Sequence, residues 1–278
     1  MTHDRLPPPR PAPDPLDDEW VGLLGEPFAA AWCQAAGRPA ILRERVLDRV
    51  TRSARASRAF VTVRQKDAPL DALADGVHAR TLYEATSRQL RPGEPRRVRI
   101  VELAAGACWR PELRDAEQSA WLPIAGELQL GELRLAPHDF HLRPAASGPA
   151  VATSPTGARF YLREAPGSPA ADAVTVRDAE AGWDDFAPGI KRRVLWAGPG
   201  GEAALLYHAL PGATVPRHGH GHDEECLMLE GEVFLDDLLL RQGEYQLAPA
   251  GTVHGGVSTD TGLLLFAHGD LALDLRPE

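Results

Sequence analysis

The sequence contains an internal repeat, and this repeat limits the possible folds more than any other feature. Four blocks recur in the same order, a little over 100 residues apart. Within them, short alternating apolar runs are separated by Gly, Pro and Asp, a pattern typical of strands. We therefore predict two copies of one β-barrel domain. The matched blocks are Asp71–Leu82 with Asp185–Leu195 (with a one-residue gap), Val101–Ala107 with Tyr207–Ala213, Gly126–Leu135 with Gly231–Leu240, and Phe140–Pro144 with Tyr245–Pro249.

The repeat divides the chain into four parts. Residues 1–18 are rich in proline and offer little apolar surface, so we expect a flexible tail. Residues 19–59 carry apolar side chains at helical spacing, as at Ile41, Val46 and Val50, and predict a short helical region. The two barrels are expected over residues 60–165 and 170–278. The predicted fold class is mainly β.

Composition excludes several classes of protein. A net charge of −9 argues against a surface that binds nucleic acid directly. No apolar run approaches the roughly 20 residues that a membrane helix needs, so no membrane partner is expected. The three cysteines form no CxxC pair, which argues against a disulfide framework and fits a reducing compartment. The chain is predicted to be cytoplasmic.

The second copy contains a cluster of metal-ligating residue types. Because strand side chains alternate between faces, His218 and His220 should point the same way, and a short turn can bring Glu224 beside them. The run 243–254 places Pro249 and Gly251 before His254, so that a turn can deliver a third imidazole. Three imidazoles and one carboxylate suit zinc, iron(II), manganese or nickel.

Both runs resemble the two sequence motifs of the cupin superfamily. Ser258 stands where the family often has Asn, at a position that is not a ligand. The resemblance implies two jelly-roll (double-stranded β-helix) barrels and a metal site at His218, His220, Glu224 and His254. The sequence of residues 224–232 further resembles the cupin domain of ChrR-type anti-sigma factors. The motif positions that match are Gly212, His218, His220, Glu224 and Gly231 in the first, and Gly243, Pro249, Gly251 and His254 in the second.

The first copy departs from the metal motif. Glu112 and Arg114 stand where the two histidines should be, and Pro149 stands in place of His254. We therefore expect a degenerate barrel without metal ligands, with an interior that Trp109, Trp121 and Phe140 could fill. Outside the motif, His222, His208 and His268 are expected to be structural.

The row of side chains after Glu224 makes further predictions. Cys226 and Met228 should point inward with Glu224, whereas Leu227 and Leu229 should face outward. Such an apolar outer face indicates contact with another barrel, either the first copy or a second chain in a homodimer. Cys226 could be a small buried hydrophobe or a thiol that reports oxidation.

The N-terminal region differs from that of ChrR-type proteins. The resemblance implies a helical sigma-binding domain with an HxxxCxxC zinc motif, but only His3 and Cys33 precede Ala40. Two ligands cannot make a closed tetrahedral zinc site. Either these helices hold a sigma factor without zinc, or the region is an anti-sigma remnant.

Three functions remain open from the sequence. The first is a regulatory, anti-sigma-factor-like sensor of a small molecule or an oxidative signal, with zinc as the expected metal. The second is an iron(II)-dependent dioxygenase that acts on a small diketone or aromatic ketone. The third is a binding module without turnover, which holds a small-molecule ligand in the C-terminal barrel.

Overall fold

The structure is a computed structural model that describes residues 60–85, 90, 94–114, 116–145, 147–148, 150–167 and 172–275. All regular elements in these residues are strands. The predicted tail and helical region, residues 1–59, lie outside the described residues. Among the described residues, no helix is long and apolar enough to cross a membrane.

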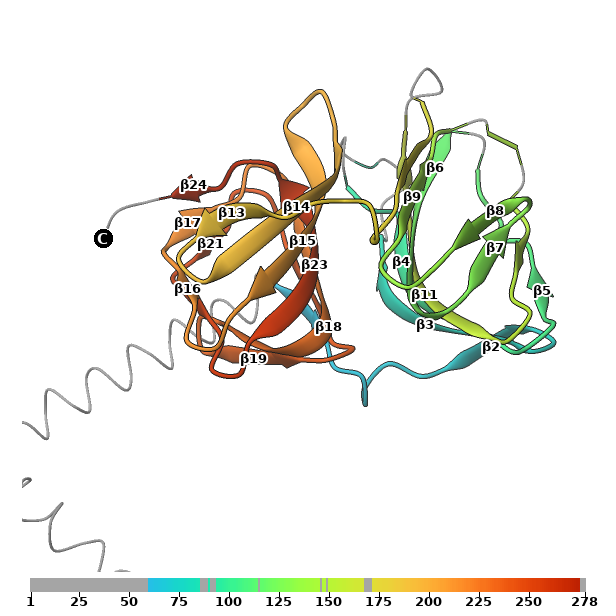
Figure 1. Cartoon of the computed structure of the whole chain (residues 1–278), viewed down its shortest axis with the longest axis horizontal. Helices are drawn as coiled ribbons and strands as arrows, with labels where there is room; N and C mark the ends of the chain where they lie inside the picture. Colours follow the sequence, from blue (N-terminus) through green and yellow to red (C-terminus); the bar gives the residue numbers. More distant parts are fainter. Residues whose placement is uncertain are drawn as a thin grey trace, which may run out of the picture. The chain divides into compact units, whose positions relative to one another are not determined.

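The first barrel combines a large sheet with a smaller one (Figure 1). The large sheet has the order β12-β9-β6-β11-β4-β3-β2, and the small sheet has the order β5-β10-β7-β8. Its own strands are β2 (Asp71–Ala74), β3 (Val77–Glu84), β4 (Arg97–Leu103), β5 (Cys108–Trp109), β6 (Glu117–Gly126), β7 (Leu128–Leu130), β8 (Leu133–Leu135), β9 (Phe140–Arg143), β10 (Ala152–Thr153) and β11 (Ala158–Pro166).

The second barrel repeats this order with β1-β20-β18-β23-β15-β14-β13, in a ten-stranded sheet that also contains β16, β19 and β22. A separate three-stranded sheet, β21-β17-β24, is added. Along the sequence, β1 (Val61–Val63) precedes both barrels, and β12 (Val174–Val176) lies between them. The other strands are β13 (Asp184–Ala187), β14 (Ile190–Ala197), β15 (Glu202–Ala209), β16 (Thr214–Val215), β17 (His218–Gly219), β18 (Glu224–Leu235), β19 (Leu238–Arg241), β20 (Tyr245–Ala248), β21 (Val253–His254), β22 (Val257–Ser258), β23 (Leu263–Asp270) and β24 (Asp274–Leu275).

The shared sheet order confirms a mainly β, jelly-roll chain and corrects one detail of the repeat. Asp71 pairs with Ala79 in the β2–β3 hairpin, and Asp184, not Asp185, takes the same place in the β13–β14 hairpin. Both hairpins shift register at the same point. The first pair of blocks therefore aligns without a gap, because Asp184 is the true counterpart of Asp71.

A glycine with a positive φ is preserved at the same place of the long strand in both copies. Gly126 and Gly231 have φ values of 71° and 74°, in the left-handed region that glycine tolerates best. A Cβ atom on either would lie 2.1 Å from the carbonyl oxygen of Gly157 or Gly262, respectively. This close approach explains why the repeat keeps glycine at both positions.

The two barrels exchange their first strands. β1 precedes the first barrel in sequence but pairs with β20 of the second, and β12 precedes the second barrel but pairs with β9 of the first. β1 thus falls inside the predicted range 60–165 while completing the large sheet of the other barrel. Each large sheet includes an edge strand from the segment before the other barrel.

Alternation of side chains separates the three largest apolar cores of the described residues. One core lies between the two large sheets, where Leu227 and Leu229 of β18 pack in one cluster with Tyr161 and Leu122 of the first barrel. The outward face of β18 therefore contacts the first copy. Cys226 and Met228 lie in the interior of the second barrel, as expected. A third cluster, which includes Trp109 and Trp121, fills the first barrel.

Phe140 was expected inside the first barrel, and this expectation is wrong. It belongs to the core between the sheets, where its ring stacks on Phe266 of the second barrel at 6.4 Å between centroids. The reason is strand parity, because Phe140 begins β9 on the face that Leu142 shares, and that face looks outward.

Candidate metal centre

The small sheet β21-β17-β24 brings the two motifs together. His218 of β17 lies directly opposite His254 of β21 in the antiparallel ladder. The pairing continues to His220, whose amide donates to the carbonyl of Thr252 at 3.1 Å. Glu224 begins the long strand β18 a few residues later. Among the described residues, the first barrel has no counterpart of this sheet, so the strands that carry His218 and His254 are an addition to the shared fold.

The structure places all four predicted residues in one cluster. Candidate ligand atoms of His218, His220 and Glu224 lie within 4.8 Å of one another. The ring of His254 lies 4.8 Å from that of His220 and 5.5 Å from that of His218, centroid to centroid, and its Nε2 is 3.6 Å from Glu224 Oε2. All four residues are buried.

Buried nitrogens without hydrogen bonds indicate what this cluster can hold. Among the described residues, both ring nitrogens of His220 and Nε2 of His254 are buried without a hydrogen-bond partner. Such groups are costly to leave unpaired in a protein interior. A divalent cation, coordinated by imidazole nitrogens and a carboxylate, would satisfy them, so the residues present fit a metal ion.

Hydrogen bonds on the far side of two rings orient them for this role. His218 Nδ1 lies 2.9 Å from the carbonyl oxygen of Pro216, an acceptor only, so this nitrogen carries the hydrogen. His254 Nδ1 lies 3.4 Å from Asp236 Oδ2. Both contacts assign Nδ1 as the donor and leave Nε2 free to face the cluster, an arrangement common around metal-ligating histidines.

Asp236 is the functional residue that the sequence reasoning missed. Its carboxylate also accepts hydrogen bonds from the amides of Gly255 and Gly256, and a Cβ atom on Gly255 would lie 2.6 Å from Asp236 Oδ1. Asp236 has a φ of 55°, and Gly131, with a φ of 63°, holds the equivalent place in the first copy. The sequence signal for this residue was an aspartate at the position where the first copy has glycine. A residue with a side chain is strained at a positive φ, so its presence there indicates that the side chain has a function.

The charges around His254 favour a cation in the cluster. Burial opposes charge on this ring, but the nearby carboxylates of Asp236 and Glu224 outweigh burial and raise the pKa of His254 to about 9. Burial likewise opposes ionisation of Glu224, yet His254 and His220 lower its pKa to about 2. The carboxylates therefore hold positive charge between them, which a proton supplies in the absence of a metal ion.

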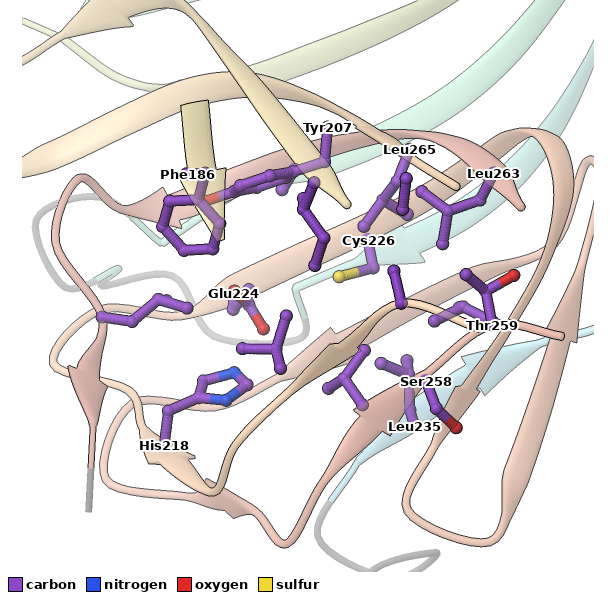
Figure 2. A pocket seen from close by; sticks show the side chains of 18 residues that line it. Phe186, Tyr207, His218, Glu224, Cys226, Leu235, Ser258, Thr259, Leu263 and Leu265 are labelled. Carbon is purple, nitrogen blue, oxygen red and sulfur yellow. The ribbon is translucent and has the colours of Figure 1, made fainter. Parts of the chain in front are cut away.

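A largely apolar pocket of about 590 Å³, partly open to solvent, extends from this cluster into the second barrel. Figure 2 shows Glu224 and His218 at one end and Ser258 and Thr259 at the other, with Cys226 between them. No Lys or Arg of the described part of the chain lines the pocket. Its lining suits a small ligand with an apolar body. The apolar lining residues are Phe186, Ile190, Ala209, Ala213, Val215, Val233, Leu235, Val257, Leu263, Leu265, Ala267 and Leu273.

The remaining histidines of the second barrel have other partners. His222 Nδ1 lies 2.6 Å from Asp270 Oδ1, and the ring is partly exposed. His268 points outward from the barrel, where it stacks on Trp196 and lies 3.5 Å from Glu202. His208 contacts the edge of Trp183.

In the first barrel, Glu112 and Arg114 are exposed, and Pro149 lies outside the described residues. Trp121 of β6 occupies the place of Cys226 and stacks on Phe160. Buried Glu164 forms ion pairs with three arginines nearby, Arg96, Arg97 and Arg99. Within the described residues no group of metal-ligating side chains was found in this barrel. Aromatic rings and ion pairs fill its interior instead.

Comparison with known proteins gives a family match for the C-terminal barrel and a fold for the described chain. Residues 171–272 match the family model of the ChrR cupin-like domain. No curated protein matches the sequence.

Many solved structures share the fold at low sequence identity. One, from Nostoc punctiforme and solved as a putative dioxygenase, is 16% identical with a TM-score of 0.61, over 80% of this chain and 88% of that one. A putative glyoxylate-induced protein from Pseudomonas aeruginosa is 16% identical with a TM-score of 0.58, over 78% and 87%. A variant of oxalate decarboxylase from Bacillus subtilis is 16% identical with a TM-score of 0.56, over 78% of each chain. The sheet order and these solved structures show a cupin-like jelly-roll fold, and residues 171–272, in the C-terminal barrel, match the ChrR cupin-like domain.

Proposed function

We propose that the chain is a ChrR-like regulatory sensor, in which the C-terminal barrel binds one divalent metal ion and a small ligand or oxidant. The observation that carries the metal site is the set of buried imidazole nitrogens of His220 and His254, unpaired within the described residues and facing the Glu224 carboxylate. The family match covers the same barrel and supports the regulatory assignment.

His218, His220, Glu224 and His254 would hold the metal ion. Four such ligands nearly close a tetrahedral zinc site, which favours a structural or sensory role, and zinc is the metal we propose first. Iron(II), manganese and nickel accept the same donors with more coordination positions. A bound ion would supply a Lewis-acidic centre at the end of the apolar pocket. The chain's own contribution is to exclude water there with residues such as Val215 and Leu273.

The regulatory part of the proposal assigns the region before the barrels to a sigma factor. Co-purification tests this directly, using the sigma factors of the source organism expressed together with the chain. Deletion of residues 1–52 removes most of this region and keeps β1, which pairs with β20 of the second barrel. We expect the intact chain to retain a sigma factor and the deletion to lose it. Recovery that the deletion leaves unchanged, or no recovery by the intact chain, would contradict the proposal.

Metal analysis of protein purified without added metal tests the site itself. We expect about one metal ion per chain, and the variant His218→Ala should lose it. The matched control is Glu112→Ala, which alters the equivalent position of the first barrel. A metal content that His218→Ala leaves unchanged would rule out the proposed ligand set.

A second candidate function is an iron(II)-dependent dioxygenase that acts on a small diketone or aromatic ketone. The pocket favours it, because apolar side chains lead to Glu224 and His218. Iron-loaded protein should then consume oxygen with a small diketone, and His254→Ala should abolish the uptake. Equal uptake by the variant would exclude this cluster as the site of the reaction.

A further inference from the structure

We propose that β1 and Phe60 form the link through which the metal centre is coupled to the chain that precedes residue 60. This inference rests on the proposed function and specifies how the sensor transmits its state. Phe60 is buried, and its ring lies 5.0 Å from the ring of His254, centroid to centroid. The N-terminal side of the described chain therefore touches a predicted metal ligand.

The strand register explains why Phe60 reaches the cluster. Val61 pairs with Leu247 of β20, so the next pair along the ladder would join Phe60 to Ala248. Ala248 in turn pairs with Glu224 of β18. Residues directly opposite each other in a sheet share a face, so Phe60 lies in the same cross-strand row as Glu224 and faces the barrel interior.

His254 is held between two contacts of different kinds. Its Nδ1 lies 3.4 Å from the Asp236 carboxylate. The ring of Phe60 packs against the His254 ring with an angle of 55° between the two ring planes. Its Nε2 is left for the metal ion. A metal–nitrogen bond restricts where the imidazole ring can lie, and it therefore restricts the surface against which Phe60 packs.

Beyond its backbone pairing with β20, β1 and the residue after it make few side-chain contacts among the described residues. Thr62 accepts a hydrogen bond from Gln246 at 3.2 Å. Arg64, just after the strand, forms an ion pair with Glu244 at 2.6 Å and donates to the carbonyl of Leu239. β1 has only three residues and lies at the edge of its sheet. Short edge elements with few buried contacts open with low free energies, so a change in Phe60 packing can alter how often β1 opens.

The first barrel provides an internal comparison. β12 is the counterpart of β1, since Val174 pairs with Leu142 as Val61 pairs with Leu247. The residue before β12 is Ala173, which is exposed. Of these two equivalent positions, only the one beside the histidine cluster carries an aromatic side chain. If the aromatic ring served only to hold an exchanged strand in place, both positions would need one.

Coupling of this kind works in both directions. If metal binding favours docked β1, then weaker docking of β1 must lower metal affinity by the same factor. Phe60→Ala should accordingly weaken metal binding although Phe60 offers no ligand atom. Val63→Ala is the matched control, because Val63 is in the same strand but packs on the opposite face, against the core between the sheets.

Hydrogen exchange of the intact chain, with and without Zn²⁺ or Mn²⁺, tests the proposal. Metal content is measured on the same samples, and the peptide that contains β12 serves as reference. We expect the bound metal to slow exchange in Val61–Val63 about five- to tenfold, with little change in β12. The slowing should disappear in Phe60→Ala, persist in Val63→Ala and return in part with Phe60→Leu.

The outcomes separate this inference from the proposed function. Metal uptake without any slowing of β1 exchange, or equal slowing in wild type and Phe60→Ala, would overturn the link alone. No uptake of either metal by the wild-type protein would overturn the metal site, and the link with it. Should Phe60→Ala fail to fold, Phe60→Leu and Val63→Ala still give the comparison.

Discussion

Arg163 of the first barrel and Glu225 of the second form a buried ion pair, with Nε 2.6 Å from Oε1 and both side chains almost wholly inaccessible to solvent. The hydroxyls of Tyr161 and Tyr245 donate to the other carboxylate oxygen, Oε2, at 2.9 and 3.0 Å. Glu225 is the neighbour of Glu224 in β18. The joint between the barrels therefore runs along the strand that carries a predicted metal ligand.

Breaking this ion pair should be strongly destabilising. Arg163→Met leaves the Glu225 carboxylate buried and without its guanidinium partner, and we expect it to lower the free energy of unfolding by about 3–5 kcal/mol. The double variant Arg163→Met/Glu225→Gln removes the unpaired charge and keeps an acceptor for both tyrosines. It should cost less than the sum of the single variants in urea unfolding. Strict additivity would show that the pair is not coupled.

Asp236→Asn should weaken metal binding. The variant keeps the size of the side chain but removes the charge that favours the Nδ1 hydrogen of His254. Outer partners of this kind typically change metal affinity about 10- to 100-fold. Competition with a metal-binding dye measures the affinity, and Asp237→Asn, an exposed neighbour in the same turn, is the control. Equal metal affinities for the two variants would show that Asp236 does not support the metal site.

Cys226 should be an unreactive thiol. Burial, together with the nearby charges of Glu224 and Glu225, raises the pKa of Cys226 well above its usual value, and the thiolate is the reactive form. In a Cys33→Ser background, iodoacetamide should label the exposed Cys108 and spare Cys226 until the protein is unfolded. Labelling of both thiols at similar rates in the folded protein would favour Cys226 as a reporter of oxidation.

His141 should make stability depend on pH. Burial, with the charge of Arg143, lowers its pKa from 6.5 to about 4, and its Nδ1 lies 2.8 Å from the Thr175 hydroxyl of the exchanged strand β12. Between these pH values the unfolded chain binds a proton that the folded chain does not. The free energy of unfolding should therefore fall as the pH drops from 6.5 to about 4, by at most about 1.4 kcal/mol per pH unit.

Unfolding in urea across this pH range measures the effect. His141→Gln should flatten the dependence, whereas His78→Gln, at an exposed position of β3, should leave it as in the wild type. A pH dependence that His141→Gln does not change would assign it to other groups.

The sequence alone was sufficient for the repeated barrels and the clustering of four residues. The barrels and the shared direction of His218 and His220 follow from local patterns, because alternation along a strand decides which side chains share a face. His254 was expected from the second motif, and it reaches the cluster through the pairing of β21 with β17. The same parity correctly placed Cys226 inside the second barrel and Leu227 outside. The spacing of His218, His220 and Glu224 likewise depends only on one strand and the turn that follows it.

The tertiary structure decided the features that depend on pairing between distant segments. The exchange of β1 and β12, the approach of Phe60 to His254 and the ion pair of Arg163 with Glu225 each join residues that no periodicity relates. The sequence of a short apolar strand does not indicate which sheet edge the strand will join. The choice depends on which edge remains open and which core the strand can cover once both barrels have formed.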